Sequence, residues 1–256
     1  MSWAKHITDD KKRFRGNGVP LTLEAMKRTA CGWLVAWLAF AQWVATWGAG
    51  TNHGFAKWEK EIAAFERMDR TNPPPRDAVL FIGSSTIRRW RTLAQDFPGQ
   101  RVINRGFGGS EILDATHFAE RIIFPYGPRM IFLRSGGNDL SRGKSPEQVF
   151  ADFREFVATV RTQLPKTEIV FISINPSPAR WEQREKDKAL NGLIVEFNRG
   201  KPHLKYLETF DMVLGDDGRP RAELFVADKL HFNTAGYARL ADKVRSLLPP
   251  APAPGS

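Results

Sequence analysis

Residues 78–87 read Ala78-Val79-Leu80-Phe81-Ile82-Gly83-Ser84-Ser85-Thr86-Ile87, which predicts a buried strand, a small-residue turn and the start of a helix. The apolar run that ends at Ile82 is too short for a helix and is typical of a core strand. Gly83 permits a sharp turn. Because open α/β sheets bind their ligands at the carboxyl ends of their strands, the hydroxyl of Ser84 or Ser85 is a candidate nucleophile. Either serine also suits a helix N-cap, a role that involves no chemistry.

Strands and helices alternate along the rest of this region. Further strands are predicted over residues 101–104, 129–134, 168–174 and 204–210, and helices over about 85–95, 146–164, 180–199 and 234–248. Another helix follows the glycine-rich turn at 105–110. This alternation implies right-handed crossovers and a parallel sheet. The predicted fold class is therefore α/β: a three-layer α/β/α sandwich with a five-stranded parallel sheet, preceded by an N-terminal apolar helix.

The length of 256 residues suits one domain with an added segment. We divide the chain into a basic, disordered segment (1–28), an apolar segment (29–50), a linker with an amphipathic helix (51–76), the α/β domain (77–248) and a Pro-rich tail (249–256). The amphipathic helix covers about residues 58–68, and the prolines at 73–75 end it.

The apolar segment 29–50 is a candidate membrane element. No charged residue occurs between Arg28 and Lys57, and tryptophans lie near both ends of the run, where membrane interfaces favour them. Lys27 and Arg28 precede the run, so the positive-inside rule places the N-terminus in the cytoplasm. We expect a domain anchored in the inner membrane and facing the periplasm.

Other interpretations of this segment stay open. A cleaved signal peptide that ends in Gly48-Ala49-Gly50, with translation starting at Met26, predicts a secreted domain. The segment is at the short end for a membrane span, and a buried helix of a soluble protein also fits the pattern. A third possibility is an anchor that binds another protein.

Charge and cysteine content exclude some functions. The net charge is +10, and residues 1–28 hold seven basic and three acidic residues, hence +4 of it. The remainder is spread without a long basic block, so we predict no nucleic-acid partner. The single cysteine, Cys31, rules out an internal disulfide and a cysteine-based metal site. The sequence indicates no oligomeric state.

Polar groups follow several of the predicted strands. They are Ser84-Ser85, Gly108-Gly109-Ser110 and Gly137-Asn138-Asp139, together with Asp228-Lys229-Leu230-His231 before the last helix. A parallel sheet brings the carboxyl ends of its strands to one edge, so these groups can converge there.

The converging groups suit ester hydrolysis. A serine hydroxyl needs an imidazole base, which His231 supplies, and Asp228 can hold the ring tautomer. The Gly109 N–H and the Asn138 amide can stabilise an oxyanion. Each group also has a plainer interpretation: Gly108-Gly109 can be a simple turn, and Asn138 a helix cap or turn residue. Asp228 and His231 can be a local hydrogen-bonded pair, or half of a metal site whose third ligand the sequence does not show. A dinucleotide-binding loop at Gly106 is excluded because no third glycine has the required spacing.

The four blocks, in this order over about residues 77–248, resemble the SGNH hydrolases, also called the GDSL family of esterases and lipases. Gly83-Ser84-Ser85 resembles the first block, with Ser84 in place of the usual Asp, and Asn104 to Gly109 resembles the second. Gly136-Gly137-Asn138-Asp139 and Asp228-x-x-His231 match the third and fourth. The resemblance implies a flavodoxin-like fold with catalytic Ser85, Asp228 and His231, and an oxyanion hole of Ser85, Gly109 and Asn138.

The resemblance also implies an acyl-enzyme mechanism with no metal and no cofactor. An extracytoplasmic location favours a small or glycan ester, and in particular a short-chain or acetyl ester. A membrane segment would also be compatible with a lysophospholipase or thioesterase that acts at the membrane, so this alternative stays open. A non-catalytic carbohydrate-binding module on the same fold is the alternative of another class.

Overall fold

The computed structural model describes residues 53–248. The basic segment 1–28, the apolar segment 29–50 and the tail 249–256 lie outside the described residues. No helix within residues 53–248 is long and apolar enough to span a membrane. The expectations of a membrane anchor and of a signal peptide therefore stay predictions.

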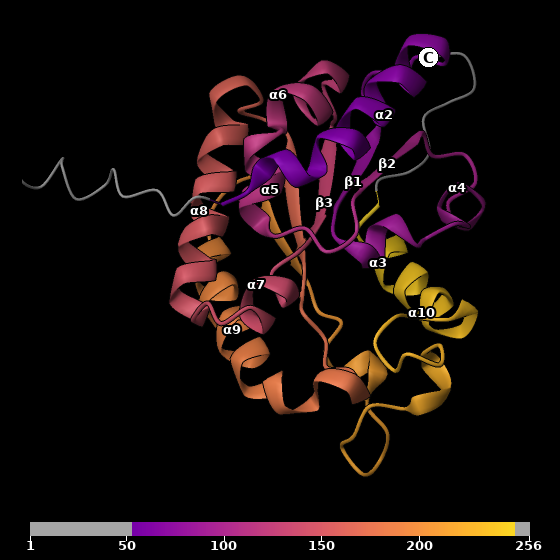
Figure 1. Cartoon of the computed structure of the whole chain (residues 1–256), viewed down its shortest axis with the longest axis vertical. Coiled ribbons are helices and arrows are strands. Elements are labelled where there is room, and N and C mark those ends of the chain that lie inside the picture. Colours follow the sequence, from indigo (N-terminus) through magenta and orange to yellow (C-terminus); the bar gives the residue numbers. More distant parts are fainter. Residues whose placement is uncertain (1–52, 249–256) are drawn as a thin grey trace, which may run out of the picture. The chain divides into compact units, whose positions relative to one another are not determined.

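A five-stranded parallel sheet forms the centre of the described domain, which confirms the predicted fold class (Figure 1). Its order is β2-β1-β3-β4-β5. The strands are β1 (Val79–Gly83), β2 (Val102–Gly106), β3 (Met130–Arg134), β4 (Glu168–Ile172) and β5 (Leu204–Leu207). All four neighbouring pairs are parallel.

Helices cover both faces of the sheet. On one face lie α2 (Glu59–Thr71), α5 (Ile112–His117), α6 (Ala119–Ile122), α8 (Pro146–Gln163) and α9 (Arg184–Asn198). On the other lie α3 (Ser85–Arg88), α4 (Leu93–Asp96) and α10 (Thr234–Arg245). The short helix α7 (Gly137–Ser141) follows β3.

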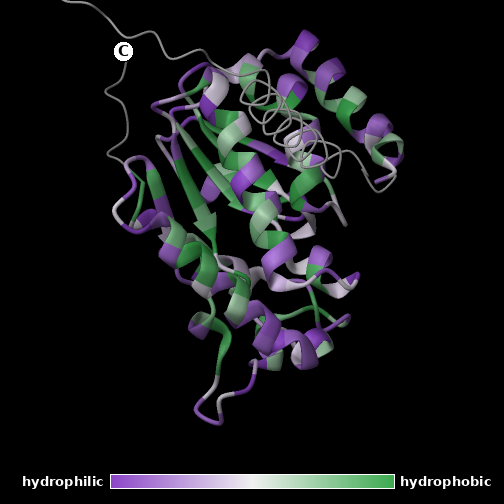
Figure 2. Ribbon diagram, turned by 90° about the vertical axis from the view of Figure 1, so that its left-hand side faces the viewer, coloured by the Kyte–Doolittle hydropathy of each residue, from purple (hydrophilic) through white to green (hydrophobic). Residues whose placement is uncertain are grey.

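Strand residues alternate between the two apolar layers, as the period of a strand requires. Leu80 and Ile82 enter the layer beneath α8, while Val79 and Phe81 enter the layer beneath α10. The central strand β1 is accordingly hydrophobic along its whole length, and many of the hydrophilic residues lie on the helices (Figure 2). β1 is buried on both faces, as its continuous apolar sequence predicted.

The amphipathic helix predicted over 58–68 corresponds to α2, which packs on the same domain. Ile62 is fully buried in the core. Arg105 of β2 binds Asp69, and Arg121 donates to Glu66 and Glu59 at 2.6 and 2.8 Å. The domain boundary at residue 77 stays a prediction.

Two predicted helices differ in the structure. The helix expected over 85–95 is divided into α3 and α4, because the side chain of Trp90 turns into the core. Its ring packs edge-on against Phe81, and its indole N–H donates to Asp96 at 2.6 Å. The helix expected over 180–199 begins only at Arg184, since Pro178–Gln183 forms a 3-10 turn. The remaining helices and strands agree in kind and differ in their end residues.

Two glycines let β1 lie close to β3 and β2 lie close to α3. A Cβ on Gly83 would lie 2.1 Å from the carbonyl oxygen of Arg134, and one on Gly106 would lie 2.1 Å from the backbone nitrogen of Arg88. Both contacts are with backbone atoms, which cannot rotate away. The start of α3, where Ser85 lies, is therefore fixed against the ends of β2 and β3.

A buried ionic cluster holds the loops that follow β2 and β3. Lys144 lies within 2.8 Å of Asp152, 2.9 Å of Glu111 and 3.7 Å of Asp139. Asp139 accepts the Ile112 N–H at 3.1 Å, which ties α7 to the start of α5. Burial raises the pKa of Asp139 to about 7, and the charge of Lys144 only partly opposes this.

Gly106→Ala is expected to destabilise the domain by on the order of 1–3 kcal/mol, because the new methyl group overlaps backbone atoms of α3. Urea unfolding measures this. Gly192→Ala is the matched control: Gly192 lies inside α9 with open space around its Cα, so alanine is expected to stabilise the helix by about 0.5–1 kcal/mol. Equal effects at both positions would contradict the close approach described above.

Asp139→Asn is expected to change how stability depends on pH. A carboxyl whose folded-state pKa is raised binds more protons when folded than when unfolded, so the contribution of Asp139 to stability falls as pH rises between about 4 and 7. Asparagine removes this loss and still accepts from Ile112. The free energy of unfolding of the variant relative to wild type should rise by a few kcal/mol between about pH 4 and pH 8. The exposed Asp242→Asn serves as the control, and a pH-independent difference for Asp139→Asn would contradict the expectation.

Candidate active site

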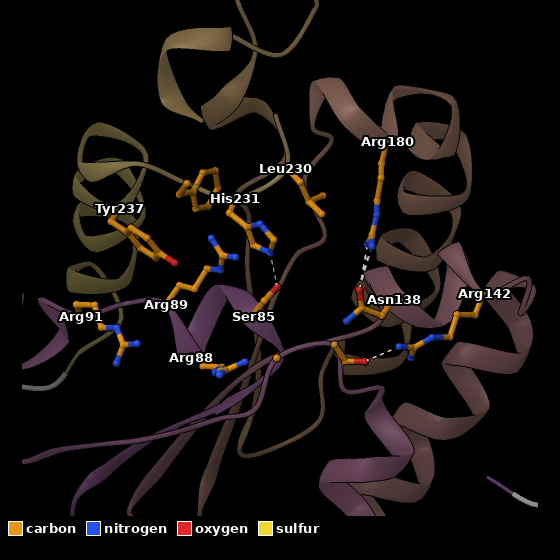
Figure 3. Close-up of a pocket in the computed structure, with 13 residues that line it drawn as sticks. Ser85, Arg88, Arg89, Arg91, Asn138, Arg142, Arg180, Leu230, His231 and Tyr237 are labelled. Carbon is orange, nitrogen blue, oxygen red and sulfur yellow. Dashed lines mark hydrogen bonds between the residues drawn. The ribbon is translucent and has the colours of Figure 1, made fainter. Parts of the chain in front are cut away.

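Ser85 lies where β1 ends and α3 begins. Gly83 has a φ of 141°, a left-handed value that glycine adopts without strain. Ser84 is the N-cap of α3, but its side chain makes no capping hydrogen bond. The hydroxyl of Ser85 is 2.9 Å from Nε2 of His231 (Figure 3). Of the two candidate serines, Ser85 is thus the one that meets the imidazole.

His231 and Asp228 lie in a tight turn before α10. Both backbone N–H groups of Leu230 and His231 donate to one Asp228 oxygen at 2.9 Å, and the other oxygen is 2.7 Å from Nδ1 of His231. These backbone and side-chain hydrogen bonds from His231 hold the pKa of Asp228 well below its usual range. Asp228 is therefore charged and fixes the His231 ring so that Nε2 faces Ser85.

Asn138 and Gly109 lie on the other side of Ser85, Asn138 in the first turn of α7 after β3 and Gly109 in the loop after β2. The Asn138 amide donates to the Ser110 carbonyl at 3.0 Å, and its oxygen accepts from Arg180 at 3.1 and 3.2 Å. Gly109 has a φ of 85°, and its carbonyl accepts from Arg142 at 2.9 Å. Arg180 thus occupies the oxygen of the Asn138 side chain, and the Ser110 carbonyl accepts from one of its two amide N–H groups. The second N–H can donate to a ligand.

Two cavities meet at Ser85 and His231. The larger has a volume of about 740 Å³ and opens over α3, Gly109 and Asn138. The smaller has a volume of about 60 Å³ and a strongly polar lining that includes Arg134, Asn175 and Asp187. All five residues predicted for the site, Ser85, Gly109, Asn138, Asp228 and His231, lie in this one region, four of them in the lining of the larger cavity and Asp228 behind His231.

Two arginines near the site were not among the predicted residues. Arg180 orients Asn138, but the sequence did not indicate this, because Arg180 lies in a charged segment that contains no motif. Arg134 ends β3 and donates to Asn175 at 2.8 Å, and burial lowers its pKa to about 10. The signal for Arg134 was present in the sequence, because a charged residue directly after the apolar run 130–133 is unusual in a buried strand. Burial also raises the pKa of the neighbouring Asp187 to about 6.

The alternative of a metal site at Asp228 and His231 has no further support. Within residues 53–248, no group of three or more His, Cys, Asp or Glu side chains is placed to hold a metal ion.

Comparison with solved structures shows the same fold in several proteins. A Streptococcus pneumoniae protein described as a platelet activating factor is 21% identical, with a TM-score of 0.66, over 82% of this chain and 98% of its own. A GDSL-like lipase from Bacteroides thetaiotaomicron is 17% identical, with a TM-score of 0.61, over 75% and 96%. An acetyl-xylooligosaccharide esterase mutant from Geobacillus stearothermophilus is 17% identical, with a TM-score of 0.55, over 68% and 94%.

No curated protein matches this chain in sequence. Residues 82–239, more than half of the chain, match the GDSL-like lipase/acylhydrolase family. The resemblance drawn from the four sequence blocks is thereby confirmed, and the chain belongs to the GDSL-like lipase/acylhydrolase family of ester hydrolases.

Proposed function

We propose that this protein is a serine esterase that hydrolyses a short-chain or acetyl ester through an acyl-enzyme on Ser85. The observation that carries the proposal is the continuous chain of contacts from Ser85 through His231 to Asp228, at 2.9 and 2.7 Å. A serine hydroxyl becomes a useful nucleophile only with such a base beside it, and the base needs a fixed tautomer.

In the proposed reaction, Ser85 attacks the ester carbonyl while His231 takes its proton at Nε2. The charged Asp228 stabilises the imidazolium. The developing oxyanion accepts from the N–H groups of Ser85 and Gly109 and from the Asn138 amide, where each donor contributes about 3 kcal/mol by analogy with a serine protease. His231 then protonates the departing alcohol, and a water molecule, activated in turn by His231, releases the acid.

The shape of the site favours a short acyl group. The smaller cavity beside Ser85 has only about 60 Å³, room for an acetyl group but not for a long chain, whereas the larger cavity of about 740 Å³ can take the alcohol. The likeness to an acetyl-xylooligosaccharide esterase agrees with this choice, and a glycan ester is the natural candidate. The proposal includes a domain held outside the inner membrane by residues 29–50.

Two alternatives have less support. A lysophospholipase or thioesterase needs an apolar groove for its acyl chain, and the linings of both cavities are rich in charged groups. A non-catalytic carbohydrate-binding module would not need Ser85 and His231 to be in hydrogen-bond contact.

Ser85→Ala is expected to lower kcat for p-nitrophenyl acetate by at least about 10³-fold, because the nucleophile is lost. Ser84→Ala is the matched control and should lower the rate only several-fold, since the Ser84 side chain makes no capping bond. A fluorophosphonate probe followed by mass spectrometry should label Ser85 in the wild type. Equal and complete loss in both variants, or absence of label on folded protein, would contradict the assignment.

Acyl chain length should separate the substrate classes. We expect kcat/KM to fall by more than about tenfold from p-nitrophenyl acetate to the octanoate, because added methylene groups do not fit the smaller cavity. Each rate is divided by the uncatalysed hydrolysis of the same ester. A preference for the octanoate would favour the lysophospholipase or thioesterase alternative.

A further inference from the structure

The larger cavity has an unusually one-sided charge. Its lining contains five arginines and no aspartate or glutamate, and the five are Arg88, Arg89, Arg91, Arg142 and Arg180. Figure 3 shows Arg88 and Arg89 close to Ser85, Arg142 and Arg180 on its other side, and Arg91 farther away. Side chains of one charge around a concave site attract ligands of the opposite charge and repel each other when the site is empty.

Two of the five arginines have structural partners. Arg142 donates to Glu111 at 2.6 Å and to the Gly109 carbonyl at 2.9 Å. Arg180 donates to Asn138 and to the Gly137 carbonyl, all at 3.1 to 3.2 Å. These contacts explain why Arg142 and Arg180 are there, since they hold the loops that carry the proposed oxyanion donors.

Arg88 and Arg89 have no comparable role. Both are exposed, and Arg88 forms no ion pair with any residue of the described range 53–248. Arg89 reaches only Asp228, at 3.8 Å, with 50% and 42% of the two side chains exposed. An exposed pair at that distance contributes little to stability. Both guanidinium groups therefore keep their donors available to a ligand.

The two arginines also lie where a substrate must pass. The Arg88 guanidinium lies against the loop that precedes Ser110. Its Nη1 is so close to Gly108 that a Cβ added there would lie only 2.8 Å away. Arg89 lies beside His231 and Asp228 (Figure 3). In the proposed mechanism His231 protonates the departing oxygen, so the alcohol part of the ester occupies the side of the site where Arg89 is.

We infer that the alcohol part of the ester carries an anionic oxygen group, a carboxylate or a phosphate, that Arg88 and Arg89 bind. Guanidinium groups are suited to this task, since each presents parallel N–H donors that match two oxygens of one anion. The inference rests on the proposed serine esterase function and specifies its substrate: a small acylated alcohol with a negative charge. A volume of about 740 Å³ is enough for such an alcohol.

Three aryl acetates test the inference. They are 4-acetoxybenzoate, 4-acetoxyphenyl phosphate and the neutral methyl 4-acetoxybenzoate, and each kcat/KM is divided by the uncatalysed rate of the same ester. The full-length wild type should prefer each anionic ester over the neutral one by at least about tenfold, mainly through a lower KM. Raising NaCl from about 0.05 to about 0.5 M should reduce this preference, because salt screens exposed charges.

The double substitution Arg88→Gln with Arg89→Gln should reduce the ratio of anionic to neutral turnover by about tenfold or more. Arg199→Gln is the matched control: Arg199 follows α9, pairs with Glu196 at 2.9 Å and lies at the opposite edge of the sheet, so the ratio should not change. A larger ratio for the phosphate than for the carboxylate would support a phosphorylated alcohol.

Two results would overturn the inference, and they are distinguishable. Hydrolysis of all three esters with equal normalised kcat/KM, or a preference that the double substitution leaves intact, would contradict the anionic alcohol and leave the serine esterase standing. No turnover of any ester, together with no fluorophosphonate label on Ser85, would contradict the serine esterase itself and with it the inference.

Discussion

Backbone contact at two glycines determines where Ser85 can be. β1 lies between β2 and β3, and the turn that follows it has no room for a Cβ at Gly83, while the end of β2 has none at Gly106. The first turn of α3 is therefore held between two strand ends. Because Gly109 and Asn138 lie in the segments that directly follow those strands, the same close approach sets the distance between the serine and both groups. A side chain at either glycine would separate them.

The fold was predictable because its signals are local. A strand buried on both faces has a continuous apolar sequence, and Asp228 and His231 are three residues apart within one turn, so neither needs long-range information. The break at Trp90 was not predictable, because it depends on the ring packing against Phe81 on a strand. Arg180 was missed for the same reason: its partner, Asn138, is 42 residues away in sequence.

The groups around Ser85 are positioned by different means, which accounts for how well each could be inferred. The Asp228–His231 turn is fixed by its own backbone N–H groups and depends on few other elements. Asn138, in contrast, is oriented by Ser110 on one side and Arg180 on the other, two contacts from separate loops. A sequence motif therefore indicates the whole Asp228–His231 turn. It indicates Asn138 but not the residues that orient it, since Ser110 and Arg180 lie outside the motif.

The arginines bear on the proposed chemistry as well as on the choice of substrate. A positive field around Ser85 stabilises a developing oxyanion but repels the positive charge that proton transfer from Ser85 places on the His231 ring. Asp228 counters the second effect, because hydrogen bonds keep its pKa well below the usual range and its charge is always present beside the ring. An anionic alcohol bound at Arg88 and Arg89 would add a second negative charge on the same side. Substrate binding would then neutralise Arg89, which lies beside His231 and Asp228. Arg142 and Arg180 would continue to hold Gly109 and Asn138, so that the charge of the substrate would assist the step it undergoes.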